Sequence, residues 1–236
     1  MLQRPAIRGI VIIIGLVMVG FVVTVVMECK GWDIAWATAA WSGGDSDNVW
    51  SHGREKPWSI LYEYGEVPIL LMLVIAAGIV WSAHLNELPR SWIRPALVML
   101  LTVLLGPCLL VNVLLKPFWG RPRPADIIVL GGDREYRSVC RPGGPGAGKS
   151  FPCGHCAMAF ALCSMVSWYP FFPRFGVASL IGGIGYGVVM GIARVLQGGH
   201  FPTDVLWSGV LVLAVVVTLY YHVLRIPQSL QDASSP

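Results

Sequence analysis

The chain has 236 residues, of which 55% are hydrophobic and 13% are charged. Soluble domains usually carry about 25% charged residues, so the composition argues against an ordinary water-soluble fold. The formal net charge is only +4, which also argues against a disordered chain and a nucleic-acid-binding protein. Six cysteines are too few for a disulfide scaffold at this length.

Six runs of 17 to 21 residues contain no Asp, Glu, Lys or Arg. As helices, runs of this length match a hydrocarbon core of roughly 30 Å. Backbone groups cannot stay unpaired in lipid, and the alternation typical of a membrane barrel is absent. We therefore predict one all-α domain over residues 1–236, an integral membrane six-helix bundle. The predicted spans are residues 9–27, 67–83, 95–115, 156–173, 175–193 and 205–224.

The first run follows two arginines, as the core of a cleavable signal peptide does. It is longer than a usual signal core, and no small-x-small cleavage site precedes Glu28. We interpret residues 9–27 as an uncleaved anchor.

Six spans place both termini on one side of the membrane. The loops on that side are short, and with the termini they carry six arginines and two acids. The other side holds eleven Lys and Arg against eleven Asp and Glu, so a raw count would make it cytoplasmic. The positive-inside rule applies to short loops, and it predicts that the two longer loops, residues 28–66 and 116–155, are extracytoplasmic.

The first of these loops is rich in tryptophan, which favours the level of the lipid headgroups. One interpretation is a short interfacial helix beside a lipid entry route, and the other is an aromatic belt that anchors the bundle. The residues concerned are Trp32, Trp36, Trp41, Trp50 and Trp58.

Three polar segments lie at the extracytoplasmic ends of the predicted spans: residues 116–124, 151–155 and 194–204. They bring together more cations than local acids can neutralise, namely Lys116, Arg121, Arg123 and Arg194. Arg presents a planar fork that matches phosphate oxygens, and Lys presents a point charge. Arginines that extend toward lipid headgroups would explain any one of these cations, but not the histidines beside them.

His155 stands in the first turn of the fourth span, where unpaired backbone N–H groups can hold phosphate oxygens and Gly154 permits close approach. His200 precedes Asp204 by four residues at the start of the sixth span. This spacing brings the carboxylate to one imidazole nitrogen and leaves the other as a nucleophile or base. The residues alone do not decide which histidine attacks.

The three segments resemble the type 2 phosphatidic acid phosphatase superfamily, whose signature is K-x6-R-P, P-S-G-H and S-R-x5-H-x3-D. Seven positions match in order over about 90 residues: Lys116, Arg123, Pro124, His155, Arg194, His200 and Asp204, with Pro152 and Gly154 also in place. Two positions depart from the signature, since Cys153 and Ala193 replace serines. A thiol is a weaker hydrogen-bond partner than a hydroxyl, so we expect the Cys153 side chain to contribute less than the signature serine.

The resemblance implies a phosphatase that needs no metal and no cofactor. By this carry-over, His200 attacks phosphorus and forms a phosphohistidine, Asp204 orients it, and His155 protonates the leaving oxygen. The residues expected to bind the phosphate are Lys116, Arg123, Arg194 and Gly154, which match the signature, and Cys153, which stands in the place of the signature serine.

The expected substrate is a phosphorylated membrane lipid whose tails stay in the lipid bilayer. The segments around Trp119 and Lys149 look most like bacterial lipid A phosphatases, so we expect lipid A as substrate and a bacterial inner membrane with the site facing the periplasm. Arg121 and Lys149 are candidates for contact with the headgroup. A phosphatidylglycerophosphate phosphatase, a prenyl diphosphate phosphatase and a lipid phosphotransferase remain open, because they share the same catalytic residues.

Cys153 and Cys156 also form a C-G-H-C sequence, the redox motif of disulfide isomerases. The alternative function, from a different class of enzyme, is therefore a membrane thiol-disulfide oxidoreductase that uses these two cysteines. The motif leads directly into an apolar helix instead of a βαβ unit, which argues against a thioredoxin-like domain. A narrower hypothesis is that oxidation of Cys153, with Cys156 or Cys140 as the resolving thiol, slows the phosphatase.

Overall fold

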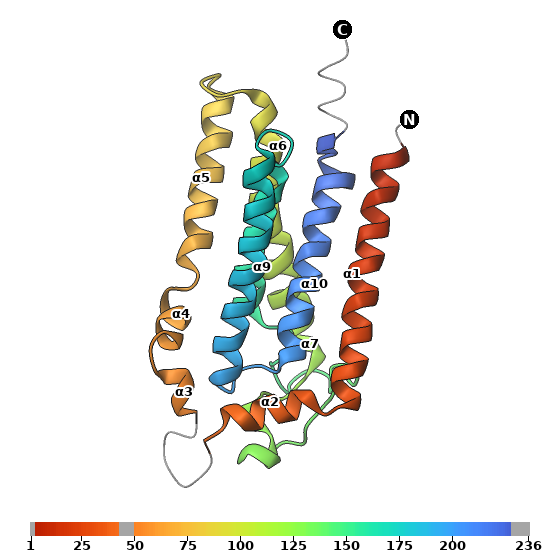
Figure 1. Ribbon diagram of the computed structural model, residues 1–236, viewed down its shortest axis with the longest axis vertical. Helices are drawn as coiled ribbons and strands as arrows, with labels where there is room; N and C mark the ends of the chain where they lie inside the picture. The colour runs from red at the N-terminus through yellow and green to blue at the C-terminus, as the bar shows by residue number, and fades with distance from the viewer. Residues whose placement is uncertain (1–2, 43–49, 228–236) are drawn as a thin grey trace.

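The computed structural model describes residues 3–42 and 50–227, which form a helical bundle (Figure 1). Within these ranges there is no β-strand, and one isolated bridge pairs Ile127 with Arg134. The prediction of an all-α fold is confirmed. The longest α-helices are α1 (Gln3–Cys29), α5 (Val67–His84), α6 (Ile93–Val103), α9 (Pro173–Leu196) and α10 (Pro202–Thr218).

Five helical stretches are long and apolar enough to cross a membrane: Pro5–Cys29, Trp58–His84, Arg90–Asp126, Pro173–Leu196 and Pro202–Val223. Large apolar side chains cover their outer surface. Val11 is 61% exposed, Val74 is 70% exposed and Ile181 is 66% exposed. Such a surface is unfavourable in water and suits lipid, so the chain is an integral membrane protein.

The third stretch is one composite helix that carries Lys116 at its end. After α6, the chain continues as the π-helix η2 (Leu104–Leu115) and then as α7 (Lys116–Trp119). Pro107 lies within η2 and has no N–H to donate to the preceding turn, so the helix departs from regular α geometry there. The Asn112 side chain donates to the Pro107 carbonyl at 2.9 Å.

The fourth predicted span is shorter than expected, because it ends at Trp168 instead of residue 173. It consists of α8 (Gly154–Phe160) and the 3₁₀ helix η5 (Ala161–Trp168). A 3₁₀ helix rises about 2.0 Å per residue, so these residues still extend over about 26 Å. A Cβ atom added at Gly187 of α9 would lie 2.3 Å from the Phe160 ring, so glycine permits the close packing of α8 on α9. This segment therefore forms the interior of the bundle.

Short helices lie at the end of the bundle opposite the start of α1 and the end of η6 (Leu219–Val223) (Figure 1). They include α2 (Trp32–Ala40), α3 (Ser51–Arg54) and α4 (Trp58–Tyr64), and the second long loop contributes η3 (Pro124–Asp126) and η4 (Ile128–Leu130). The 3₁₀ helix η1 (Arg90–Trp92) precedes α6.

Helix α2 lies across the ends of α9 and α10 (Figure 1). It buries Asp33, Ala37 and Ala40 on one face, whereas Trp32 and Trp36 are 46% and 57% exposed. The structure therefore contains the short helix predicted from the tryptophans, with an indole-bearing outer face.

Candidate active site

The three polar segments meet at the end of the bundle that carries α2 and α7. Lys116 lies within electrostatic range of Arg123, Arg194 and Asp204. A methyl group at Gly154 would lie 3.5 Å from the Lys116 Nζ. His155 in turn lies within electrostatic range of Arg194 and His200. The structure thus brings together the matched residues that the sequence distributes over three loops: Lys116, Arg123, Gly154, His155, Arg194, His200 and Asp204.

His200 and Asp204 face each other at the start of α10, where both side chains are buried. Pro202 occupies the first turn of the helix, and the Phe201 N–H donates to the Asp204 Oδ2 at 2.8 Å. The His200 Nδ1 lies 3.7 Å from the same oxygen, which is within ion-pair range but too long for a hydrogen bond. The start of α10 therefore directs the carboxylate at the imidazole.

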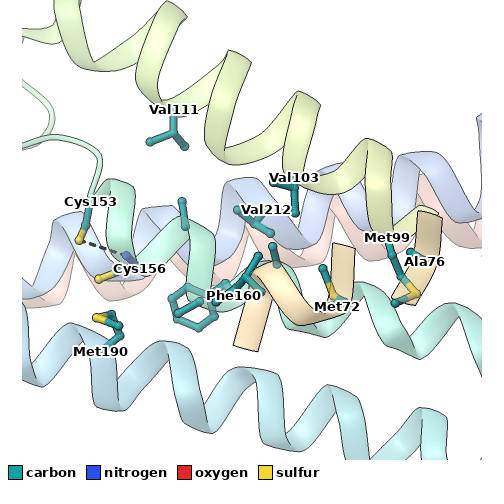
Figure 2. Packing of buried hydrophobic residues seen from close by; sticks show 14 of the residues in the cluster. Met72, Ala76, Met99, Val103, Val111, Cys153, Cys156, Phe160, Met190 and Val212 are labelled. Atoms are coloured by element: carbon teal, nitrogen blue, oxygen red, sulfur yellow. Dashed lines mark hydrogen bonds between the residues drawn. The ribbon is translucent and has the colours of Figure 1, made fainter. Parts of the chain in front are cut away.

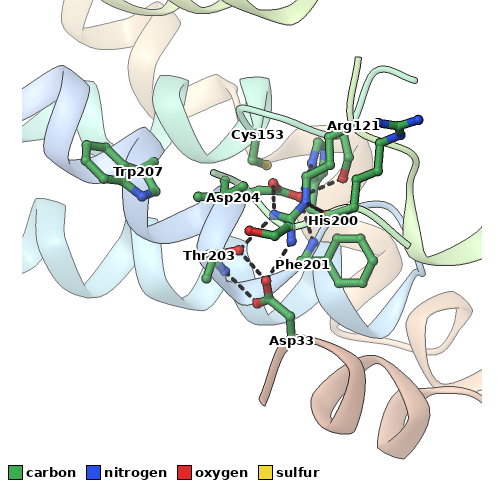
Figure 3. Close-up of polar contacts among 12 residues, drawn as sticks. Asp33, Arg121, Cys153, His200, Phe201, Thr203, Asp204 and Trp207 are labelled. Carbon is green, nitrogen blue, oxygen red and sulfur yellow. Dashed lines mark hydrogen bonds and ion pairs between the residues drawn. The ribbon is translucent and has the colours of Figure 1, made fainter. Parts of the chain in front are cut away.

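The Asp204 carboxylate has two further partners. The Ser150 hydroxyl donates to Oδ2 at 2.6 Å, and the Arg121 guanidinium contacts Oδ1 at 2.6 Å (Figure 3). Ser150 was not among the predicted residues, because nothing in the local pattern distinguishes it from other loop serines. Both contacts hold the carboxylate in place from the second long loop.

The prediction that Arg121 contacts the substrate headgroup is wrong, because of where its side chain lies. Arg121 is only 1% exposed, and its guanidinium is bound within the protein, so it cannot reach a headgroup at the surface. Lys149 is exposed, but it is not among the residues that line the cavity described below. Its contact with a headgroup stays a prediction.

Cys153 points into the protein. Its Sγ accepts a hydrogen bond from the Cys156 N–H at 3.4 Å (Figure 2), and its own N–H donates to the Ser208 hydroxyl at 2.9 Å. The N–H groups of Cys153 and Cys156 are therefore engaged within the protein, and the phosphate-binding role predicted for this helix start falls to the N–H groups of Gly154 and His155. Helix α8 has only seven residues, so its dipole is correspondingly weak.

Cys153 and His200 affect each other electrostatically. Burial alone raises the pKa of the Cys153 thiol, but hydrogen bonding with Cys156 and the charge of His200 outweigh burial and hold this pKa well below its usual value. Burial alone lowers the pKa of His200, but Cys153 and Asp204 outweigh it and raise this pKa.

The redox alternative does not suit this geometry. Cys153 and Cys156 are both fully buried. Thiol-disulfide exchange needs a sulfur atom that an external thiol or disulfide can reach. These two cysteines could react in that way only after the bundle opened.

A cavity of about 520 Å³ opens beside the cluster. Arg123 and Arg194 contribute to its wall, and the remaining lining residues come mainly from α3, α4 and the loop after α9: Trp50, Gly53, Arg54, Ser59, Tyr62, Glu63, Ala125, Asp126, Gln197, Gly198 and Gly199. Gly199, the residue before His200, also lines the cavity, whereas His200 itself is not among the lining residues. The Nε atoms of Arg123 and Arg194 are buried without a hydrogen-bond partner.

Arg194 is oriented by residues that the sequence did not indicate. Its guanidinium lies 4.8 Å from the centre of the Tyr62 ring and donates to the Gln197 side chain. The Gln197 amide donates in turn to the Gly53 and Trp58 carbonyls at 3.1 and 3.2 Å. Helices α3 and α4 therefore help to place a cation that belongs to α9.

The helices and this cluster define an integral membrane protein with a cationic site that contains two histidines and suits a phosphate ester. Among residues 3–42 and 50–227, no group of three His, Cys, Asp or Glu side chains is placed to hold a metal ion. The model of the PAP2 superfamily matches residues 95–227, more than half of the chain. The chain belongs to the PAP2 superfamily, as the resemblance indicated.

Curated relatives carry a more specific name. The chain is 27% identical over 169 residues to a lipid A 4'-phosphatase of Francisella tularensis subsp. novicida, which covers 66% of this chain and 71% of that protein. It is 35% identical over 126 residues to a lipid A 4'-phosphatase of Rhizobium leguminosarum, covering 50% and 52% of the two chains. A third lipid A 4'-phosphatase, from Rhizobium etli, is 29% identical over 163 residues, which are 65% of this chain and 61% of that protein. The matches to the two Rhizobium proteins thus span less than two thirds of their lengths. No solved structure matches the chain.

Proposed function

We propose that this protein hydrolyses a phosphate monoester of lipid A, at the 4' position, without a metal ion. The observation that carries the proposal is the pair of arginines Arg123 and Arg194, which line a cavity that also reaches Gly199, the neighbour of His200, and whose buried Nε atoms have no hydrogen-bond partner. Buried donors of this kind are costly unless a ligand satisfies them, and a phosphate group has the oxygens and the charge to do so.

In the proposed first step, the Nε2 of His200 attacks phosphorus. The bond between phosphorus and the lipid oxygen breaks, and His155 gives its proton to that oxygen. Asp204 faces the Nδ1 of His200 and stabilises the positive charge that develops on the imidazole. Its 3.7 Å separation shortens when the ligand is bound, as catalytic hydrogen bonds often do.

In the second step, water attacks the phosphohistidine and His155 takes the proton from that water. The bond between phosphorus and Nε2 breaks, and inorganic phosphate leaves. Lys116, Arg123 and Arg194 hold the non-bridging oxygens throughout, with the N–H groups of Gly154 and His155. Preorganised cations supply most of the rate enhancement in phosphoryl transfer, because the charge is spread over these oxygens.

Lipid A is favoured as the substrate by the names of three relatives and by the place of the site. The cavity is lined mainly by α3, α4 and the loop after α9, at the end of the bundle where the short helices lie (Figure 1), so a headgroup can enter there while the acyl chains stay beside the membrane-spanning helices. We further propose that this end faces the periplasm across a bacterial inner membrane, as the short-loop arginines indicate.

The test is phosphate release from lipid A by purified enzyme in detergent, in the presence of a strong chelator. We expect release to persist with the chelator, to disappear in His200→Ala and to survive in Cys156→Ala. The product should be lipid A that lacks the 4'-phosphate, identified by mass spectrometry. Loss of activity on chelation, or full activity of His200→Ala, would contradict the mechanism.

The same assay separates the remaining alternatives. Faster turnover of phosphatidylglycerophosphate or of a prenyl diphosphate would replace lipid A as the substrate while keeping the catalytic residues. Transfer of the phosphate to a second lipid instead of water would identify a phosphotransferase.

A further inference from the structure

Helix α2 delivers a buried carboxylate to the active-site end of the bundle. Asp33 lies in the first turn of α2 on the face that packs against α9 and α10, and it is 1% exposed. The outer face of the same helix carries the exposed indoles of Trp32 and Trp36. Residues 32–40 precede the part of the chain that the family model matches.

Arg121 joins this carboxylate to Asp204. One guanidinium nitrogen lies 2.7 Å from the Asp33 Oδ2, and the other terminal nitrogen lies 2.6 Å from the Asp204 Oδ1 (Figure 3). Its Nε donates to the Arg137 carbonyl at 2.9 Å, and the guanidinium carbon lies 4.4 Å from the centre of the Phe201 ring. The planar fork is thus fixed in one orientation.

Asp33 also holds the backbone beside Asp204. Its Oδ1 accepts a hydrogen bond from the Thr203 N–H at 3.1 Å, and its Oδ2 accepts one from the Thr203 hydroxyl (Figure 3). The Thr203 hydroxyl oxygen also accepts from Arg121 at 2.8 Å. The first turn of α10 is therefore held by a carboxylate from another helix.

We propose that Asp33 and Arg121 are positioning residues for the His200 nucleophile, so that helix α2 forms part of the active site. Arg121 holds one oxygen of Asp204, and the other oxygen of Asp204 faces the imidazole. Asp33 holds both Arg121 and Thr203, and so it sets the direction of the carboxylate. This inference rests on the proposed function, because it assumes that His200 attacks phosphorus.

The burial of Asp33, Arg121 and Asp204 indicates that these charges do more than attach α2 to the bundle. The Asp33, Arg121 and Asp204 side chains are 0 to 2% exposed, and buried charges are costly compared with apolar packing of the same volume. An apolar side chain would attach α2 at lower cost, but it would not orient Arg121.

The experiment measures kcat, KM and the pH profile of phosphate release from lipid A in detergent micelles. Asp33→Asn preserves the shape of the side chain and removes its charge. We expect kcat to fall about 10- to 100-fold, the effect of a misplaced catalytic group, with KM within about twofold of wild type. Asp133→Asn is the matched control, because Asp133 forms an exposed pair with Arg134 at 3.9 Å, and it should be unchanged.

The pH profile distinguishes positioning from loss of structure. The titratable groups that face His200 are Cys153, Asp204 and His155. Removal of the Asp33 charge makes the surroundings of the imidazole less negative, so the acid limb of the profile should move to lower pH. A purely structural defect would lower the amount of active enzyme without moving this limb.

Thr203→Val provides a second variant if Asp33→Asn does not fold. It leaves no charge unpaired and removes the hydroxyl that contacts both Asp33 and Arg121. We expect a fall in kcat of about 3- to 10-fold with KM unchanged, the size expected when a hydrogen-bonded hydroxyl is removed. Wild-type kcat and pH profile in the folded variants would overturn the inference, as would an effect confined to KM. If His200→Ala also keeps its activity, the proposed function fails instead.

Discussion

Replacement of Arg121 by methionine should be among the most destabilising single changes in this protein. The guanidinium lies between Asp33 and Asp204, at 2.7 and 2.6 Å, and all three side chains are 0 to 2% exposed. Methionine has a similar length but no charge, so two buried carboxylates would lose the cation that they share. Removing one partner of a buried ion pair costs about 3–5 kcal/mol.

This cost corresponds to a large change in the melting temperature. For a chain of roughly 150–250 residues, 1 kcal/mol lowers the midpoint by about 2–4 °C, so we expect a decrease of about 6–20 °C. The assay is thermal unfolding of the detergent-solubilised protein, followed by tryptophan fluorescence.

Arg134→Met is the matched control, since it removes the same charge from an exposed pair. Arg134 and Asp133 are 3.9 Å apart, with side chains 44% and 91% exposed, and such pairs contribute little. The double variant Arg121→Met with Asp33→Leu should recover part of the loss, because it leaves one unpaired carboxylate fewer. If Arg121→Met melts within about 2 °C of the control, the reasoning from burial is wrong.

Three further predictions follow from the site. Because folding raises the pKa of His200, its contribution to stability is complete below the unfolded pKa of about 6.5 and is lost as pH rises through the folded pKa. The difference in unfolding free energy between wild type and His200→Gln should therefore shrink as pH rises above about 6.5, and a constant difference would contradict this. Gly154→Ala should lower kcat/KM by about 100-fold with little change in the melting temperature. Its methyl group would lie 2.9 Å from the Asn112 Oδ1 and 3.5 Å from the Lys116 Nζ, where phosphate oxygens are expected. Activity near wild type would argue against that position for the phosphate. A membrane-permeant maleimide should label the native protein at Cys29 and Cys140, which are exposed at the end of a span and in a loop, and label the buried Cys153, Cys156 and Cys163 only after unfolding. Cys108 faces lipid within a membrane-spanning stretch, where its thiol does not ionise, so it should also stay unlabelled until the protein unfolds; peptide mass spectrometry would show the pattern.

The membrane-spanning helices could be predicted from the sequence because hydropathy is a local property. A run of about 20 apolar residues has to pair its backbone groups internally in lipid, whatever its neighbours are. The prediction was less accurate for the fourth span, where the chain changes from α to 3₁₀ geometry after Phe160. That change accompanies close packing of α8 on α9, which a single segment does not reveal.

The sequence by itself also determined the residues of the PAP2 signature. Lys116, His155 and Asp204 stand at spacings that can be counted along the chain, and the alternation of the predicted spans across the membrane places their segments at one face. The four-residue separation of His200 and Asp204 places them near each other through the geometry of one helix start.

Only the tertiary structure decided what holds Asp204 in place. Arg121 is 83 residues from Asp204 along the chain, and Asp33 is 170 residues from Thr203. In the sequence, Arg121 looks like another phosphate-binding cation, and nothing in the local pattern singles out Asp33. Their roles depend on which helix faces which, because a buried charge is stable only next to a partner that packing supplies from elsewhere in the chain.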